Sequence, residues 1–328
     1  MIDRDSRHRD SRHRDSRPIF VLVGFTASGK KKVGVTLAER IDAEIISLDS
    51  MKVYRQMDIG TAKPSSADRR RVPFHLLDVV DPCESFSVGK YLEAARDRVR
   101  EIHERRRRVL FLGGTALYMN RLLHGLFSTP PLDPRYKAEL LDDASRRGTL
   151  YLHGRLRGAD PASALTIHQN DLKRIVRALE VIHATGKPLS WLKANRTMRM
   201  IPNPAVVAGL RWPRETLEER IRRRTRKMLE AGLVEEVRRI LADPGFGSES
   251  GKAIGYAEII DHLYGRLSLS EAEEAINRNS LSFATKQETW YRRVEEMRWV
   301  AMASAVDLDR AVDELAEYFL TSESELTG

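Results

Sequence analysis

Short apolar runs rich in β-branched residues recur along the chain, at residues 18–24 (PIFVLVG), 44–50 (EIISLDS), 108–114 (RVLFLGG) and 205–212 (AVVAGLRW). Runs of this length and composition predict strands that are buried on both faces. Residues 30–41 have helical spacing, and residues 115–126 also predict a helix. The alternation predicts an α/β fold, a mostly parallel sheet with helices on both faces.

The more polar stretches are organised differently. From about 130 to 189, charged helical segments alternate with turn signals and nothing predicts a strand, so we expect a helical insertion. Ser270 and Glu273 have capping-box spacing at the start of a long C-terminal helix. Helical patterns are found at 215–231, 233–242, 253–264, from 270 towards 299, and at 309–320. We therefore expect a discontinuous core, residues 18–129 and 203–322, and an insertion, residues 130–202.

The N-terminus is a short tandem repeat, DSRHRDSRHRDSR, without a hydrophobic residue. Such a segment has nothing to bury, so residues 1–17 are expected to be a disordered basic tail. The tail is either simply solvated, which we favour, or an arm that binds nucleic acid. The whole chain has a formal net charge of +9, which suits a polyanionic partner but also occurs in enzymes with small substrates.

Composition excludes several classes of protein. No run approaches the roughly 18 apolar residues of a membrane span, and the N-terminus lacks the apolar segment of a secretion signal. A single cysteine, Cys83, leaves no disulfide framework and no thiolate cluster for zinc. These features predict a cytoplasmic protein.

The stretch GFTASGKKK, from Gly24 to Lys32, is close to the phosphate-binding pattern GxxxxGK[ST]. It lies between a predicted strand and a predicted helix, where its backbone N–H groups and the helix dipole would face a phosphate. Lys31 takes the place of the Ser or Thr whose hydroxyl binds Mg²⁺ in that pattern. The alternative is a glycine-rich turn followed by an exposed lysine run, which we consider less favoured. The expected diphosphate ligands are Gly24, Thr26, Ala27, Ser28, Gly29, Lys30 and Lys31.

Two further segments follow predicted strands. Asp49 comes at the end of the second run, at the sheet edge where α/β proteins bind ligands. Its carboxylate is expected either to act as a general base or hold Mg²⁺, or to cap the turn that follows; spacing alone does not separate these. Gly113 and Gly114 end the third run and permit a close approach of backbone, and Thr115 then caps the next helix or donates to a phosphate.

An arginine-rich helix, RIRRRTRKM at 220–228, places Arg220, Arg223 or Arg224, and Lys227 on one face. Such a face can clamp a diphosphate or an RNA backbone. The competing interpretation is a solvated face paired with Glu218 and Glu219.

Taken in order, several segments resemble the bacterial tRNA dimethylallyltransferases, from about Pro18 to Arg293. They are GFTASGK, DSMKVYRQMDIGTAKP, FHLLDVVDP, FSVGKY, GGTALYMNRLLHGL, IHQNDLKRIVRALEVIHATGKPLS, MLEAGLVEEV, AIGYAE and KQETWYRR. The number, order and spacing of these segments make the resemblance specific.

The resemblance implies a P-loop NTPase-like core with a channel, and a helical insertion that contacts the tRNA anticodon arm. It implies transfer of a dimethylallyl group from dimethylallyl diphosphate to N6 of adenosine 37 in tRNAs reading codons that begin with U. A monomer that uses Mg²⁺ is also implied, with the metal weakened here by Lys31.

Roles for individual residues follow from the same resemblance. Asp49 matches the general base, Arg224 the arginine that neutralises the diphosphate, and Thr115 a residue facing the channel. Contacts to tRNA are expected from Lys52, Asp58, Thr61, Lys63, Arg174, Lys286 and Gln287.

The chain departs from the family pattern at several functional positions: Phe25, Lys31, Lys52, Phe74, Ala116, Arg226, Leu281, Ser282 and Thr285. We favour an active enzyme in which Lys31 supplies charge where a metal would lie, because Asp49, Lys30, Thr115 and Arg224 remain. The alternatives are a diverged, catalytically impaired tRNA-binding paralogue and an ATP-dependent small-molecule kinase.

Overall fold

The structure is a computed structural model, and it describes residues 17–127, 130–195, 201–294, 297–304 and 307–328. The described residues form two compact units, one within Met1–Leu123 and Ile201–Gly328 and the other within His124–Met200. The expected tail lies outside the described residues except for Arg17. Arg17 is tied to the larger unit, because its guanidinium donates to the His103 carbonyl and its own carbonyl accepts from Asn203.

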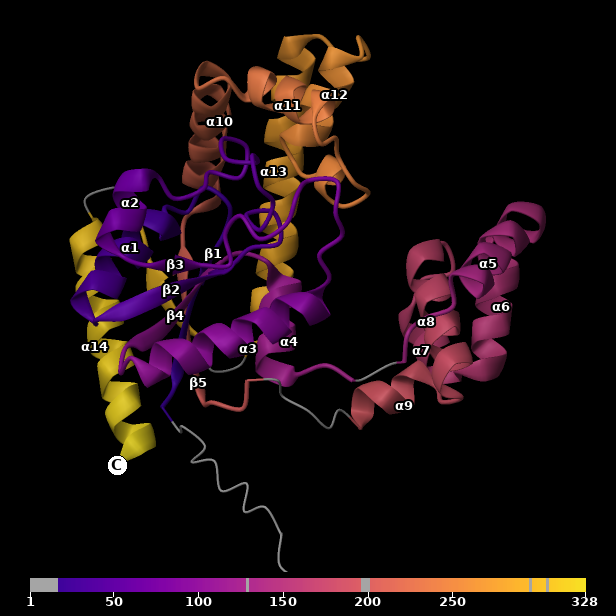
Figure 1. Cartoon of the computed structure of the whole chain (residues 1–328), viewed down its shortest axis with the longest axis horizontal. Helices are drawn as coiled ribbons and strands as arrows, with labels where there is room; N and C mark the ends of the chain where they lie inside the picture. Colours follow the sequence, from indigo (N-terminus) through magenta and orange to yellow (C-terminus); the bar gives the residue numbers. More distant parts are fainter. Residues whose placement is uncertain (1–16, 128–129, 196–200, 295–296, 305–306) are drawn as a thin grey trace, which may run out of the picture. The chain divides into compact units, whose positions relative to one another are not determined.

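A parallel six-stranded sheet in the order β3-β2-β4-β1-β5-β6 forms the centre of the larger unit (Figure 1). The strands that the apolar runs predict are β1 (Ile19–Gly24), β2 (Ala43–Leu48), β4 (Arg108–Gly113) and β5 (Ala205–Arg211). The two edge strands, β3 (Phe74–His75) and β6 (Arg298–Ala301), were not predicted. A helix reaching Trp299 is therefore wrong: α13 (Leu269–Tyr291) ends earlier and Trp299 lies in β6.

Helices cover both faces of the sheet, which confirms the α/β class. The chain moves outward from β1 to β2 through α1 (Lys30–Arg40) and returns from β3 to β4 through α3 (Val88–Glu104), so right-handed crossovers place these two helices on opposite faces. Phe319 of α14 (Leu308–Thr327) stacks on Phe20 of β1 with ring centroids 4.7 Å apart. The shorter helices α2 (Ser66–Arg71) and α4 (Ala116–His124) follow β2 and β4.

The C-terminal helices of this unit are α10 (Arg214–Glu230), α11 (Leu233–Ala242), α12 (Tyr256–Leu263) and α13. The predicted capping box of α13 is wrong by two residues. Ser268 and Glu271 form it, since each side chain bonds the other's backbone N–H. A 3₁₀ turn at Ser250–Lys252 and Gly255 precede α12, so this helix starts three residues later than its pattern predicts.

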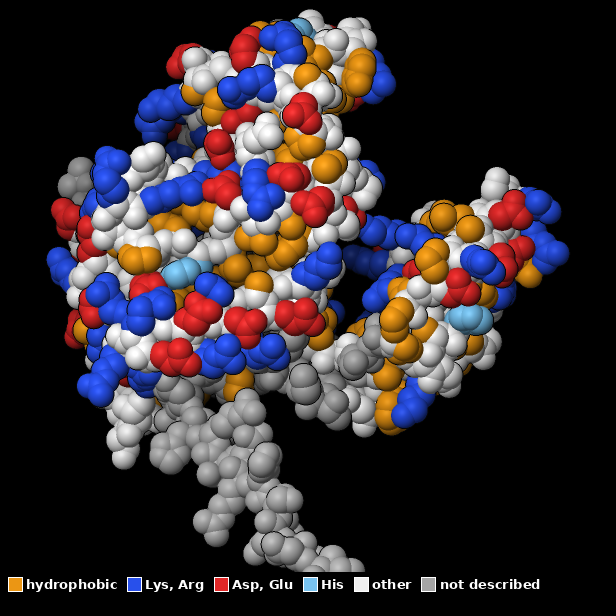
Figure 2. Space-filling model, viewed as in Figure 1, with side chains coloured by type: hydrophobic (Ala, Val, Ile, Leu, Met, Phe, Trp, Pro, Cys, Tyr) orange, Lys and Arg blue, Asp and Glu red, His pale blue; other side chains and the backbone are white. Residues whose placement is uncertain are grey.

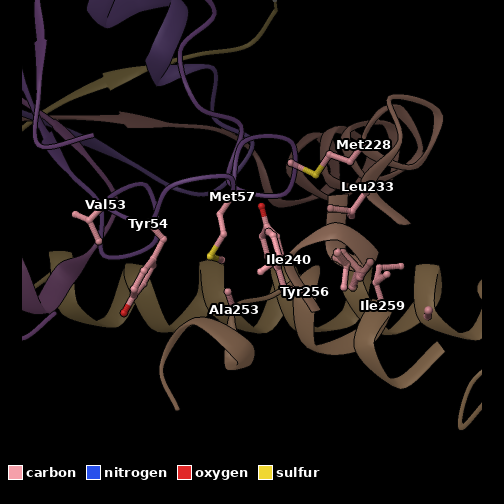
Figure 3. Close-up of a cluster of buried hydrophobic side chains, with 12 residues drawn as sticks. Val53, Tyr54, Met57, Met228, Leu233, Ile240, Ala253, Tyr256 and Ile259 are labelled. Carbon is pink, nitrogen blue, oxygen red and sulfur yellow. The ribbon is translucent and has the colours of Figure 1, made fainter. Parts of the chain in front are cut away.

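A buried apolar cluster joins the segment after β2 to these helices (Figure 3). Val53, Tyr54 and Met57 contribute from the segment, and Tyr256 and Leu233 are among their partners. All five are at most 1% exposed, so the segment that follows Asp49 is held by a core of its own.

Among its described residues, the secondary-structure elements of the smaller unit are helices. Its helices are α5 (Pro134–Arg147), α6 (Thr149–Ala159), α7 (Pro161–Thr166), α8 (Leu172–Thr185) and α9 (Leu189–Ala194). Leu140, Leu152, Leu156 and Ile175 form its fully buried centre. Asp160 accepts from Ser163 and Ser190 and so ties α7 to α9.

On the face of the larger unit shown in Figure 2, lysine and arginine side chains are interspersed with aspartate and glutamate. Ion pairs of this unit include Arg55–Asp81 (3.0 Å) and Arg69–Asp78 (2.8 Å). No helix among the described residues is both long and apolar enough to cross a membrane.

Candidate active site

The carboxyl ends of β2 and β4 are tied together at one edge of the sheet. A Cβ on Gly113 would lie 2.0 Å from the Leu48 carbonyl oxygen, so only glycine permits this approach. The same carbonyl accepts from the N–H groups of Gly114 and Thr115, each at 3.2 Å. The Thr115 hydroxyl in turn accepts from the Ser50 N–H at 3.0 Å. Thr115 therefore holds the turn that carries Asp49.

We call residues 24–30, the loop after β1, the phosphate-binding loop because of their sequence motif, and three side chains donate to carbonyl groups of this loop. Lys30 donates to the Phe25 carbonyl, Arg220 to that of Ala27 at 2.8 Å, and Trp212 to that of Ser28 at 2.8 Å. Gly29 adopts φ +82° at the start of α1, a conformation that favours glycine. The N–H groups of Ala27 and Gly29 find no acceptor in the described part of the chain. The loop thus presents unpaired N–H groups at a helix N-terminus, as a phosphate site requires.

The arginine-rich helix α10 faces this loop with two of its arginines. Arg224 donates to the Thr26 hydroxyl at 2.7 Å, and its Nε is buried without a partner among the described residues. Arg220 lies over the Trp212 ring, 4.0 Å from its centroid. Arg223 is exposed, so helical spacing identified the face but did not separate Arg223 from Arg224. Arg220 was on the predicted face but was not expected in the site.

Gln287 lies elsewhere than expected. It was predicted to contact tRNA, but its side chain is 2% exposed. Its Oε1 accepts from the Thr26 N–H at 3.0 Å and its Nε2 donates to the Gly114 carbonyl at 2.6 Å. Tyr291, one helical turn further along α13, donates to the same carbonyl. Gln287 therefore fixes the spacing between the phosphate-binding loop and the end of β4, a role that no local sequence pattern reveals.

Asp49 caps the turn that follows it, which is one of the roles that the sequence left open. Its Oδ1 accepts from the N–H groups of Met51 (2.9 Å) and Lys52 (3.3 Å), which is the turn-capping arrangement. No described residue bonds its Oδ2. The cations Lys30, Lys52 and Arg224 interact electrostatically with the same carboxylate.

The cations also act on one another. Burial, followed by the charges of Lys52 and Arg224, lowers the pKa of Lys30 to about 7, although Asp49 opposes the shift. Burial likewise lowers the pKa of Lys52 and that of Arg224. A group of cations whose charged forms are disfavoured, chiefly by burial, favours the approach of an anion.

Lys31 does not extend over the phosphate-binding loop. Its Nζ lies 3.2 Å from Asp68 Oδ2 and donates to the Lys63 carbonyl at 3.3 Å. The expectation that Lys31 supplies its charge directly to the diphosphate is therefore corrected. It links the start of α1 to the segment around α2.

The segment from Asp58 to Lys63, expected to contact tRNA, is shaped by buried polar groups. Lys63 is 7% exposed, and its ammonium contacts Asp58 and Asp78, both at 2.6 Å. Thr61 donates to the Met57 carbonyl. Lys63 therefore stabilises the segment from within as a buried ion-pair partner, while Asp58 is exposed.

Glu236 of α11, which was not expected in the site, stabilises the backbone of the segment from Asp58 to Lys63. Its carboxylate accepts from the N–H groups of Asp58, Ile59 and Gly60 and from the Tyr256 hydroxyl. It is 2% exposed.

Arg174 and Lys286, also expected to contact tRNA, are exposed. Arg174 pairs with Asp171 (3.2 Å), which caps α8. Lys286 lies on α13.

Six of the nine positions that depart from the family pattern line two cavities. Lys31, Lys52 and Phe74 line a small cavity of about 20 Å³ beside Lys30 and Gly113. Phe25, Leu281 and Thr285 line a larger cavity of about 590 Å³ with Trp212 and Met302 among its other walls. These six departures therefore fall in two groups, while Ala116, Arg226 and Ser282 line neither cavity.

The residues present do not fit a Mg²⁺ held by the protein. Mg²⁺ prefers oxygen ligands, chiefly carboxylates and hydroxyls. Position 31 offers an ammonium group, and Asp49 faces three cations. Across the described ranges, no group of three or more His, Cys, Asp or Glu is arranged to hold a metal ion.

The sheet order and the loop after β1 define a protein with a P-loop NTPase-like fold. Family comparison is more specific, since a model described as IPP transferase matches residues 52–294 and one described as isopentenyl transferase matches residues 17–78. The chain belongs to the IPP transferase family and is therefore a transferase enzyme.

Individual relatives agree with this assignment. The chain is 40% identical over 302 residues to the tRNA dimethylallyltransferase of Bacillus licheniformis, covering 92% of this chain and 96% of the relative. It is 43% identical over 291 residues to that of Geobacter metallireducens, covering 88% and 94%. The crystal structure of the tRNA isopentenylpyrophosphate transferase of Bacillus halodurans superposes with a TM-score of 0.71 at 38% identity, covering 95% and 98%.

Proposed function

We propose that the protein transfers a dimethylallyl group from dimethylallyl diphosphate to N6 of adenosine 37 in tRNAs that read codons beginning with U. The supporting observation is that the phosphate-binding loop, Arg224 and Asp49 meet at one sheet edge in a chain whose relatives are named tRNA dimethylallyltransferases.

In this proposal the phosphate-binding loop takes the diphosphate. The open N–H groups of Ala27 and Gly29 point to its oxygens, and Lys30 adds a charge. Arg224 is braced through one Nη by Thr26, which leaves its buried Nε to donate to the ligand. Such fixed donors stabilise the negative charge that develops as the diphosphate leaves.

The reaction exchanges one bond for another. The bond between C1 of the dimethylallyl group and its diphosphate oxygen breaks, and the electron pair leaves with the diphosphate. The N6 lone pair of adenine forms the new bond to C1, and N6 becomes acidic as that bond forms. Its proton passes to Asp49, whose Oδ2 is open while Oδ1 holds the turn. Thr115 acts as a positioning residue through Ser50.

Recognition of tRNA is assigned to exposed groups in both units. Arg174 and Lys286 offer exposed cations for phosphates, and Asp58 is an exposed acceptor. Lys63 and Gln287 support these surfaces from the interior. The target adenine leaves its stack to reach Asp49, as chemistry on a base requires.

The test is a transfer assay. Purified protein is mixed with labelled dimethylallyl diphosphate and an unmodified anticodon stem-loop with adenosines at 36, 37 and 38. A second stem-loop has guanosine at 37, and an Asp49→Asn variant is assayed in parallel. We expect label on the first stem-loop alone and a large loss in the variant. Stem-loop binding without transfer would instead support a catalytically impaired binding protein, and ATP-dependent phosphorylation without RNA would support a kinase.

A further inference from the structure

The place where a P-loop protein usually coordinates Mg²⁺ is built differently in this chain. The hydroxyl of the GK[ST] pattern is replaced by Lys31. The Lys31 side chain carries no oxygen, and its ammonium pairs with Asp68 and the Lys63 carbonyl, so position 31 offers no side-chain ligand to a metal.

Charge at this place favours an anion over a second cation. Lys30, Lys52 and Arg224 surround Asp49, so three cations face one carboxylate. The charge of Lys31 is paired with Asp68, but it still adds to the charges that lower the pKa of Lys52. A divalent cation would add two more positive charges to a group that already repels itself, whereas a diphosphate would balance it.

A small cavity marks where the ligand's oxygen would lie. Lys30 and Lys52 line it, together with Lys31, Ser47 and Gly113. The Ser47 hydroxyl is 3% exposed and has no hydrogen-bond partner among the described residues. A volume of about 20 Å³ admits a single oxygen-sized group, and a buried hydroxyl without a partner is costly unless one is supplied.

We infer that the protein binds the diphosphate of its donor without a divalent cation, and that Lys52 with Lys30 supplies the charge that a metal supplies in other P-loop proteins. A diphosphate oxygen enters the cavity and accepts from Lys52 and Ser47. Lys31 removes the metal ligand and braces the segment around α2. This inference rests on the diphosphate site of the proposed function, but it concerns binding and requires no RNA.

The experiment measures the binding of inorganic pyrophosphate by calorimetry, with a chelator or with Mg²⁺, in the absence of RNA. For the unmodified protein, we expect dissociation constants in the two conditions to agree within about threefold. In Lys52→Gln, binding with chelator weakens by about tenfold or more, because a half-buried cation that lines the cavity is lost. In the double variant Lys31→Thr with Lys52→Gln, Mg²⁺ restores binding, because position 31 again offers a hydroxyl.

Lys32→Thr is the matched control, since Lys32 is the exposed neighbour of Lys31 and should leave binding unchanged in both conditions. Loss of pyrophosphate binding by the unmodified protein in chelator, with recovery in Mg²⁺, would overturn the inference without any variant having to fold. Unchanged binding in Lys52→Gln would reject the role of Lys52. Metal-independent binding in a protein that transfers no label would contradict the proposed function alone.

Discussion

The two ends of strand β2 carry acidic residues in opposite surroundings. Glu44, near the amino end, is 5% exposed and accepts from His75 at 2.7 Å and from Arg105 at 3.0 and 2.7 Å. Burial opposes its ionisation, but the hydrogen bonds from Arg105 and His75 outweigh this and lower the pKa of Glu44. At this end of the strand, both carboxylate oxygens of Glu44 are hydrogen-bonded.

Asp49, directly after the carboxyl end, has one oxygen committed to a turn and faces three cations. At the Glu44 end of β2 the acidic charge is matched by its partners, and we call this the balanced end. At the Asp49 end the positive charges outnumber the single carboxylate. The comparison teaches that the balance of charge, rather than the presence of an acidic residue, separates a stabilising pair from a binding site.

The largest expected effect comes from Asp49→Asn. The amide keeps an oxygen for the turn but cannot take a proton, so kcat for transfer should fall by about 10³-fold. Pyrophosphate affinity should hold or rise, because a negative charge is removed. Steady-state kinetics and calorimetry measure the two effects. The control is Asp42→Asn at the exposed amino end of β2, which should leave both unchanged. If Asp49→Asn kept more than a tenth of the original rate, the role of Asp49 as general base would be rejected.

At the balanced end, Glu44→Ala should lower the free energy of unfolding by about 3 kcal/mol, because two partners lose a buried acceptor. The exposed pair Glu39–Arg71 provides the control, and Glu39→Ala should cost about 0.5 kcal/mol or less. Urea denaturation measures both.

The pH dependence of the free energy of unfolding gives a second test of Glu44. The pKa of Glu44 is lowered in the folded state, so its contribution is present above the unfolded pKa of about 4.3 and is lost as pH falls through the folded value. The difference between Glu44→Ala and the unmodified protein should therefore shrink at low pH. Equal costs for Glu44→Ala and Glu39→Ala at neutral pH would contradict the comparison.

Arg224→Met should reduce transfer by about 10²-fold, since one preorganised donor to the leaving diphosphate is lost. Arg223→Met removes the same charge from the same helix one residue away, where the side chain is exposed, and should change the rate little. Comparison of kcat/KM for the two variants is the measurement. Similar losses in both would mean that α10 acts through its overall charge.

The smallest expected effect is on pH dependence. The pKa of Lys30 is about 7 in the free protein, and an anion bound beside it favours the charged form. Binding therefore takes up a proton above this pH, and pyrophosphate affinity should fall by about fivefold from pH 7 to pH 8. Calorimetry in buffers of different ionisation enthalpy counts the protons. Lys30→Arg, whose charge does not titrate, isolates the ligand's own ionisation; an equal slope there would exclude Lys30.

The sequence was sufficient for the fold class, because β1, β2, β4 and β5 are continuous apolar runs. The edge strand β3 has two residues and β6 four, too short to show a period, so both were missed. Trp299 extended the helical pattern into β6 because its neighbour in space, β5, is distant in sequence.

The site was predictable where a motif reflects local backbone geometry, as in Gly29 with Lys30, or where position at a strand end determines location, as for Asp49. Gln287 and Lys63 were misplaced because exposure depends on tertiary packing. The motif identified Lys31 as a departure from the GK[ST] pattern, but its partner Asp68 could not be read from the spacing.

Glu236 gives the segment after Asp49 a further property. Its carboxylate accepts hydrogen bonds from three successive backbone N–H groups, and residues before them pack into the apolar cluster. The conformational entropy of this segment is therefore lost when the protein folds and not when a ligand arrives. A surface whose shape is set in advance in this way binds with less entropic opposition than a loop that must be ordered on contact.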